Sequence, residues 1–186
     1  MASRQLFPKG VYLEVPRFPS GEIYTIESLE SPQQISSADY KKIIKICNEP
    51  LLYKSLFEKK FRGKSYPPKA AHDFIRVAAN SWHDGTWLVF FIRDPQKEIA
   101  AAIDLKAVED DQAEIGYWAS EKHSGIMTNT VNAICNLVKK AGLEYLYALV
   151  RPENKKSANI LLRLHFIKTA KRRVDGKIHH VFARNL

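Results

Sequence analysis

The second half of the chain alternates between short apolar runs and segments with helical spacing, and this alternation limits the possible folds more than any other feature. Trp87–Ile92, Ile99–Leu105 and Ala113–Trp118 are apolar runs of strand length. In Thr128–Ala141 the apolar residues recur at helical spacing, and Gly142 follows as a helix-ending residue. Strands that alternate with helices predict an α/β domain with a mixed sheet.

The same alternation continues to the end of the chain. We expect a strand at Tyr145–Val150, a helix at Ser157–Leu164, and two further strands at Phe166–Val174 and Ile178–Ala183. Between the last two strands, Asp175-Gly176 is typical of a type I′ hairpin turn, in which both central residues take positive φ.

Two strands and two amphipathic helices are expected in the first half. Short apolar segments predict strands at 11–15 and 23–26. The first helix follows Ser36-Ser37, which are good N-cap residues, and ends near Asn48. The second helix begins after Pro67-Pro68 and ends at Asp84-Gly85.

Length and composition indicate one folded domain over residues 1–186. The chain is 45% hydrophobic, which is enough for a sizeable core. It has no apolar run of roughly 20 residues and no signal peptide, so we expect no membrane partner. The two cysteines, Cys47 and Cys135, lie in expected helices and have no metal-ligand spacing. A cytoplasmic location without a metal is therefore expected.

The formal net charge of +9 favours anionic partners, although a solvated basic surface would explain the same number. Lys171-Arg172-Arg173 is the longest basic run, and aromatic residues do not interleave with it as they would in a base-stacking surface. Nucleic acid is thus an unlikely partner. The charge would suit an acidic protein or the phosphates of a cofactor.

Two strand-to-helix junctions could hold an anion. Lys122–Met127 follows the strand that ends at Trp118, and Arg151–Ser157 follows the next expected strand, Tyr145–Val150. A helix that begins after such a loop offers free backbone N–H groups and the positive end of its dipole. Each junction also has a purely structural explanation, because Gly125 can form a turn and Asn154 can cap the helix that follows it.

The order of these segments resembles the GNAT acetyltransferases. Ala113–Trp118 is similar to the fourth strand of the branch that acetylates the N-termini of ribosomal proteins. Lys122–Met127 is similar to the acyl-CoA motif Q/R-x-x-G-x-G/A, with Gly125 at its first glycine. Pro152–Ser157 matches P-E-N-x-x-S, and Leu164-His165-Phe166 takes the place of L-G-F.

The resemblance implies a GNAT fold, with a mixed, mostly antiparallel sheet flanked by about four helices. It also implies acetyl-CoA as co-substrate, no metal, and direct transfer of the acetyl group to a primary amine. The branch implies a protein N-terminal α-amine as acceptor, and a small-molecule amine is the alternative. A second alternative is a degenerate domain that binds acyl-CoA without catalysis, because the loop before Gly125 is short and Leu161 stands where many members carry tyrosine.

The resemblance also assigns roles to individual residues. Glu114 aligns with the general base of several members and shares its strand face with Gly116 and Trp118. With the usual tyrosine replaced, either Ser157 or a water molecule would be the acid that protonates the leaving thiolate. The residues expected to contact acetyl-CoA are Trp118, Ala119, Lys122, His123, Ser124, Gly125, Ile126, Met127, Thr128, Asn154 and Ser157.

Overall fold

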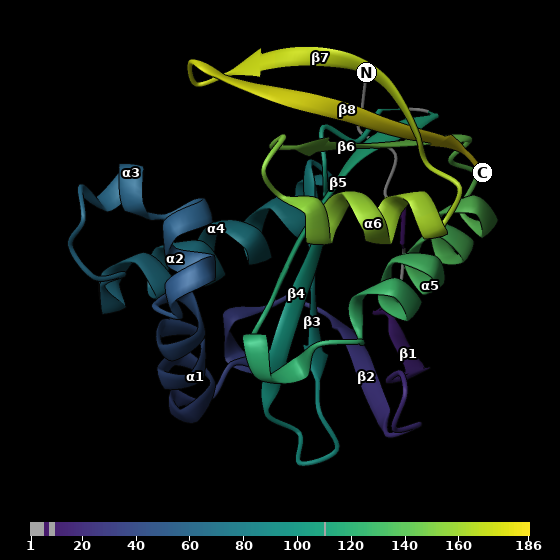
Figure 1. Cartoon of the computed structure of the whole chain (residues 1–186). Coiled ribbons are helices and arrows are strands. Elements are labelled where there is room, and N and C mark those ends of the chain that lie inside the picture. The colour runs from purple at the N-terminus through teal and green to yellow at the C-terminus, as the bar shows by residue number, and fades with distance from the viewer. Residues whose placement is uncertain (1–5, 8–9, 110) are drawn as a thin grey trace.

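A mixed sheet forms the centre of the molecule. The computed structural model describes residues 6–7, 10–109 and 111–186, and over these residues the sheet has eight strands in the order β1-β2-β3-β4-β5-β6-β8-β7 (Figure 1). Neighbouring strands are antiparallel except for β5 and β6, which are parallel. The strands are β1 (Tyr12–Pro16), β2 (Ile23–Ser28), β3 (Trp87–Arg93), β4 (Ile99–Lys106), β5 (Gln112–Ala119), β6 (Tyr145–Val150), β7 (Ile167–Val174) and β8 (Lys177–Asn185).

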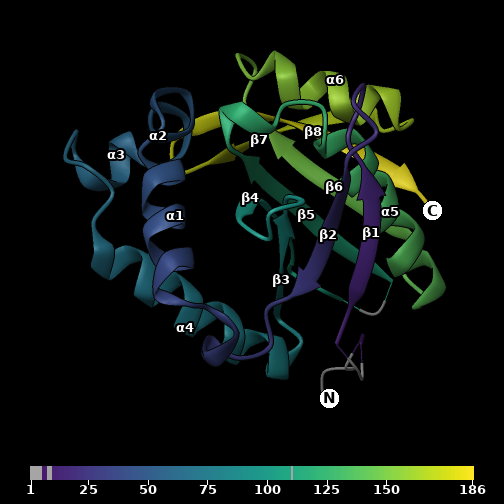
Figure 2. The ribbon, with the colours of Figure 1, turned by 90° about the horizontal axis from the view of Figure 1, so that it is seen from below.

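Helices cover both faces of this sheet (Figures 1 and 2). One core cluster joins apolar residues of α1 and α4 to β3 and β4, and the other joins α5 and α6 to the sheet. Among the described residues no helix has the length and hydropathy to span a membrane. The helices are α1 (Ser37–Cys47), α2 (Pro50–Leu56), α3 (Glu58–Phe61), α4 (Pro68–Asp84), α5 (Met127–Lys140) and α6 (Lys155–Arg163), with short 3₁₀ turns η1 (Pro32–Gln34) and η2 (Glu121–His123).

Local signals in the sequence explain where the predicted helices begin and end. Ser36 accepts a hydrogen bond from the Asp39 N–H and the Asp39 carboxylate accepts one from the Ser36 N–H, which closes a capping box at α1. Asp39 is held in addition by Arg93 of β3, with 2.7 Å between Nη1 and Oδ1. Gly85 ends α4 with a φ of 67°, a left-handed conformation that favours glycine.

The last two strands form the predicted type I′ hairpin. Val174 and Lys177 are paired, and the two residues between them have positive φ, 48° at Asp175 and 76° at Gly176. Strand β7 is the edge of the sheet, and all its residues except Val174 are exposed. The hairpin therefore extends from the body of the sheet as an exposed arm.

The sheet opens between β5 and β6. These strands pair only at Gln112–Tyr145, Ala113–Leu146 and Glu114–Tyr147. Beyond Glu114, β5 stays paired with β4 to its end while β6 stays paired with β8 to its end. The two strands thus diverge, and residues 115–119 of β5 are left without a partner strand on that side.

Helices α2 and α3 were not expected from the sequence. The first helix ends near Asn48 as expected, but Pro50 then occupies the first turn of α2, where proline loses no hydrogen bond. Both helices are short and neither contains a fully buried residue, so no apolar stripe marks them.

Candidate active site

The side chains of β5 divide between the two faces of the sheet. Glu114, Gly116 and Trp118 face the α1–α4 side, where Trp118 packs on the core cluster of α1 and α4. Ile115 and Tyr117 face the α5–α6 side and belong to, or pack on, the other cluster. The side chain of Glu114 is 18% exposed, and the nearest cation is Lys106, with 3.7 Å from Nζ to Oε1.

A second carboxylate lies beside Glu114. Asp104 of β4 is paired with Gly116, and a Cβ on Gly116 would lie 2.4 Å from Asp104 Oδ1. Trp87 Nε1 donates to Asp104 Oδ2 at 2.8 Å, and Lys106 Nζ is 3.8 Å from the same oxygen. Asp104 Oδ1 is buried and has no hydrogen-bond partner among the described groups. A donor that entered here would therefore meet an unsatisfied carboxylate oxygen.

The start of α5 has the features of an anion site. Its N-cap residue, Ile126, makes no side-chain cap hydrogen bond, so no side chain competes for the first N–H groups of the helix. The side chains of Ile126 and Met127 are buried in the core. Ser124 and Gly125, just before the helix, are exposed. Only the backbone of Ile126 and Met127 is thus available to a ligand, together with the dipole of α5.

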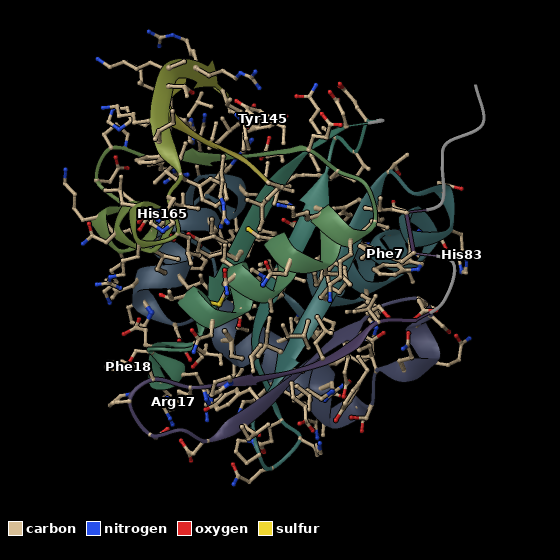
Figure 3. All side chains as sticks on the ribbon, turned by 90° about the vertical axis from the view of Figure 1, so that its right-hand side faces the viewer. Phe7, Arg17, Phe18, His83, Tyr145 and His165 are labelled. Atoms are coloured by element: carbon tan, nitrogen blue, oxygen red, sulfur yellow. The ribbon has the colours of Figure 1, made fainter. Side chains whose placement is uncertain are left out.

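Arg17 and Phe18, from the loop between β1 and β2, support this junction. Arg17 donates to the carbonyl of Ser124 through Nε at 3.0 Å and to that of Lys122 through Nη2 at 3.3 Å. The Phe18 N–H donates to the carbonyl of Gly125 at 3.4 Å. Figure 3 shows Arg17 and Phe18 on this loop, at the end of the molecule where α5 begins. Neither residue could be identified from the sequence, because no motif links them to a loop more than 100 positions away.

The contact with Phe18 also explains why glycine stands at 125. Gly125 has a φ of 94°, and a Cβ there would lie 2.0 Å from the carbonyl oxygen of Phe18. From the sequence, Gly125 was either a turn residue or the first glycine of an acyl-CoA motif. In the structure, the space that a Cβ would need is filled by the chain itself, so a larger residue would disturb the fold before it met a ligand.

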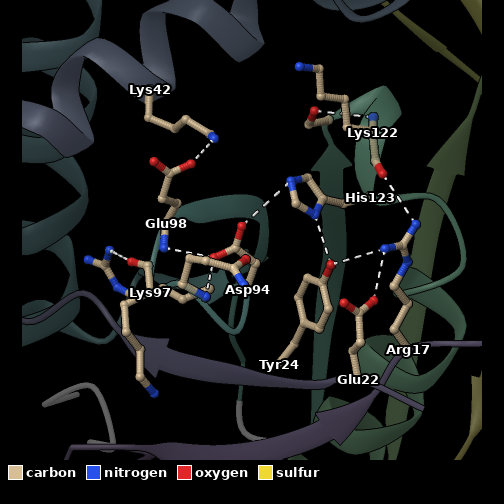
Figure 4. Close-up of polar contacts among 12 residues, drawn as sticks. Arg17, Glu22, Tyr24, Lys42, Asp94, Lys97, Glu98, Lys122 and His123 are labelled. Carbon is tan, nitrogen blue, oxygen red and sulfur yellow. Dashed lines mark hydrogen bonds and ion pairs between the residues drawn. The ribbon is translucent and has the colours of Figure 1, made fainter. Parts of the chain in front are cut away.

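His123 is turned away from the junction (Figure 4). Its Nδ1 is 2.9 Å from the hydroxyl of Tyr24, and its Nε2 is 4.0 Å from Asp94 Oδ2. Burial lowers the pKa of His123 below its usual value, and the Asp94 carboxylate opposes this change. The side chain of His123 therefore belongs to a polar network under the loop, and only its backbone could contact a cofactor.

On the other side of the opening, Asn154 and Ser157 begin α6. Asn154 Oδ1 accepts from the Ser157 N–H at 3.1 Å, so the expected N-cap is confirmed. The Ser157 hydroxyl lies 2.8 Å from the phenol of Tyr117, which reaches across from β5. Burial raises the pKa of Tyr117 to about 12, and the hydrogen bond to Ser157 partly offsets this. Tyr117 was not among the site residues expected from the sequence. The alternation along β5, which places residue 117 on the face toward α5 and α6, is the sequence signal that could have identified it.

The loop between β5 and α5 is anchored by a residue that no motif predicts. Glu49, which follows α1, accepts hydrogen bonds from the Ser120 hydroxyl at 2.6 Å and from the Glu121 N–H at 2.7 Å. The expected contact residues therefore gather around this anchored loop and around the start of α6. Of these, the exposed or partly exposed ones are Trp118, Ala119, Lys122, His123, Ser124, Gly125, Thr128, Asn154 and Ser157.

Both cysteines are buried. Cys135 is 1% exposed on the inner side of α5, as expected, and burial raises its pKa to about 11. No three His, Cys, Asp or Glu side chains in the described part of the chain come together as a metal site.

Comparisons with known proteins agree with this geometry. A family model described as "Acetyltransferase (GNAT) domain" matches residues 33–167, which is more than half of the chain. Among characterised protein sequences there is no significant match.

Solved structures share the fold at low identity. Mycobacterium smegmatis RimJ, in complex with a CoA disulfide, is 19% identical, with a TM-score of 0.70 over 97% of this chain and 88% of that one. RimL, a ribosomal L7/L12 α-N-protein acetyltransferase in complex with coenzyme A, is 17% identical, with a TM-score of 0.69 over 94% and 98%. The acetyltransferase MccE, in complex with acetyl-CoA and AMP, is 19% identical, with a TM-score of 0.73 over 99% and 100%. The family model and the shared fold together identify the chain as a member of the GNAT acetyltransferase family.

Proposed function

We propose that this enzyme transfers the acetyl group of acetyl-CoA to the α-amine at the N-terminus of a protein. The observation that carries the proposal is the opening between β5 and β6. The anion-binding start of α5 and the start of α6 lie on one face of the sheet, whereas Glu114 and Asp104 lie on the other. An acyl donor held on the first face can reach through the opening to an amine on the second.

The donor would be held mainly by backbone groups. Acetyl-CoA supplies the acyl group as a thioester together with a pyrophosphate. The N–H groups of residues 125–128 and the dipole of α5 would bind the pyrophosphate, with Lys122 as a nearby cation. The unpaired side of β5 at Trp118 and Ala119 offers backbone groups to the pantetheine arm. Asn154 and Ser157 lie at the far side of the same opening.

Glu114, on the face of the sheet where the acceptor amine would bind, would remove one proton from that amine. A protein α-ammonium has a pKa of about 8, so Glu114 needs to take only one loosely held proton, directly or through water. The neutral nitrogen then attacks the thioester carbonyl carbon and gives up its second proton to water as the C–S bond breaks, and the proton of the Ser157 hydroxyl passes to the departing sulfur. Tyr117, at 2.8 Å from Ser157 Oγ, can return a proton to that oxygen.

A protein α-amine is favoured over a small amine by two observations. The segments Ala113–Trp118 and Pro152–Ser157 are those in which the chain resembles the N-terminal acetyltransferase branch. RimJ and RimL, whose fold the chain shares, carry names from that branch. A lysine side chain, with a pKa of about 10.4, would demand far more of Glu114.

The test has two parts. Acetyl-CoA at 100 times its Kd should stabilise the protein by about 2.7 kcal/mol, which a thermal shift measures directly. The enzyme is then offered a library of N-terminal peptides, the same peptides with blocked α-amines but free lysines, and a set of polyamines. Mass spectrometry should find acetyl groups on α-amines alone. No thermal shift at millimolar acetyl-CoA, or transfer confined to lysines or polyamines, would overturn the proposal.

A further inference from the structure

Nearly all of the net charge of the chain lies in two segments. Residues 50–64, which include α2 and α3, contain five basic side chains and one acidic side chain, a net charge of +4. Residues 167–177, which form β7 and the hairpin turn, also contain five basic side chains and one acidic one. Together these segments hold +8 of the net +9. We call the two segments the basic arch.

The two halves of the basic arch touch each other. Lys59 of α3 donates through Nζ to the carbonyl oxygen of Asp175, at the tip of the hairpin, over 2.9 Å. In Figure 1 the hairpin tip lies above α3, although more than 100 residues separate them in the chain. The fold therefore brings these two basic segments together on one side of the molecule.

The positive charge of the arch is not neutralised within the described residues. None of its ten basic side chains forms an ion pair with an acidic side chain there. His180, opposite Lys171 on β8, is affected by this charge: burial lowers its pKa, and then Lys168, Lys171 and Lys155 lower it further. Unpaired charge of one sign over a connected surface attracts an oppositely charged partner.

The arch lies beside the proposed acceptor site. Glu114 on β5 is paired with Tyr147 on β6, so both side chains point to the same face of the sheet. The guanidinium of Arg172, on β7, lies over the ring of Tyr147 at 5.6 Å from its centre. Glu114, Tyr147 and Arg172 thus form a row that leads from the proposed base to the hairpin.

We propose that the basic arch binds an acidic segment that follows the N-terminus of the acceptor protein. This inference rests on the proposed function, since it places the acceptor α-amine at Glu114. From β5 to β7 there are three strand spacings of about 4.8 Å, or roughly 14 Å, which about four extended residues span. The acceptor should therefore carry Asp or Glu from about its fifth residue onward.

A polypeptide fits this surface better than a nucleic acid does. Residues 167–177 contain no aromatic side chain on which a base could stack. In the other half of the arch, Phe57 and Phe61 pack on each other and on Tyr66. An acidic polypeptide, in addition, carries the α-amine that the site needs.

The experiment measures binding without requiring acetyl transfer. Three fluorescent probes of similar length are compared by anisotropy at about 50 and 200 mM salt: a peptide with Glu at positions 5–10, the same peptide with Gln there, and a single-stranded RNA of equal charge. The Glu peptide should bind at least about tenfold more tightly than the Gln peptide at low salt, and the difference should shrink at high salt. Equal binding of the two peptides, or tighter binding of the RNA, would overturn the proposal.

Matched variants locate the binding surface. Lys171→Glu with Arg172→Glu reverses two charges on the exposed hairpin and should abolish the preference for the Glu peptide. Lys139→Glu with Lys140→Glu reverses two charges at the end of α5, outside the arch, and should leave the preference intact. Circular dichroism of each variant checks its folding. If both double variants lose the preference equally, net charge rather than the arch explains it, and the proposal fails. Loss of acetyl transfer without loss of peptide binding would count against the proposed function alone.

Discussion

The phenol of Tyr117 and the hydroxyl of Ser157 lie 2.8 Å apart, and this contact joins β5 to α6 across the opening in the sheet. Tyr117→Phe removes the hydroxyl and keeps the ring, so the packing is preserved. We expect turnover to fall about tenfold with little change in acetyl-CoA affinity, because Ser157 loses the group that orients it and returns its proton.

A double-mutant cycle with Ser157→Ala separates this role from simple packing. If Tyr117 acts through Ser157, the double variant should be no slower than Ser157→Ala alone. Losses that multiply in the double variant, or a Tyr117→Phe enzyme with full turnover, would show that the contact is only structural.

Glu114→Gln tests the proposed base. The change keeps the shape and the hydrogen-bonding capacity of the side chain but removes the proton acceptor. Turnover with an N-terminal peptide should fall by about 10²-fold at neutral pH and should recover at high pH, where the α-amine is already neutral. Acetyl-CoA affinity should not change. Glu144→Gln, at an exposed position before β6, is the matched control and should behave as the wild type.

Arg17 should matter for cofactor affinity although it lies outside the acyl-CoA motif. Its two hydrogen bonds to the carbonyls of Lys122 and Ser124 are worth about 1–2 kcal/mol together, so Arg17→Ala should weaken acetyl-CoA binding by about 5- to 30-fold. Calorimetry with the variant measures this. Arg76→Ala, on the exposed side of α4, provides the comparison, and equal affinities of the two variants would contradict the role given to Arg17.

Two glycines allow the clash at position 125 to be separated from backbone strain. Gly125 and Gly21 both have positive φ, but a Cβ on Gly21 would meet nothing within 4 Å. Gly21→Ala should therefore lower the free energy of unfolding by about 1 kcal/mol, and the positive φ at this position is the sole cause. Gly125→Ala should cost clearly more, because its Cβ would collide with the Phe18 carbonyl. Denaturant melts of both variants measure the difference, and equal losses would show that the loop moves aside freely.

The lowered pKa of His123 predicts a dependence of stability on pH. Below about pH 6.5 the unfolded chain binds a proton at this residue that the folded chain resists, so stability should fall as the pH drops from 7 toward 5. One such group contributes a slope of at most about 1.4 kcal/mol per pH unit. His123→Gln should flatten the curve in this range, whereas His83→Gln, at an exposed position, should not. Parallel curves for wild type and His123→Gln would contradict the assignment.

Much of the fold was predictable because its signals are local. The helix that follows Ser36 has its cap in the sequence, the helix that ends at Gly85 has its stop there, and Asp175-Gly176 specify their turn within two residues. Each of these features depends on neighbours in the chain, and sequence patterns report such neighbours directly.

The parts of the site that could not be predicted depend on distant contacts. Glu49 and Arg17 hold the same loop from two separate parts of the first half of the chain, and neither lies in a motif. Gly125 was recognised as part of a motif, but the reason for its conformation is the carbonyl of Phe18, which only the folded structure brings near. Motifs identified the two strand-to-helix junctions as candidates, while the contacts that support these junctions required the tertiary structure.

The short pairing between β5 and β6 has a mechanical consequence. Within the part of the chain that the structure describes, β5 and β6 pair at only three positions, so backbone pairing between the β1–β5 part of the sheet and the β6–β8 part is short along this seam. The helices that follow each strand, and the contact of Tyr117 with Ser157, carry the rest of the connection. A molecule seated in the opening would touch both parts at once and act as a brace between them. Occupancy of the site is thereby coupled to the rigidity of the whole sheet.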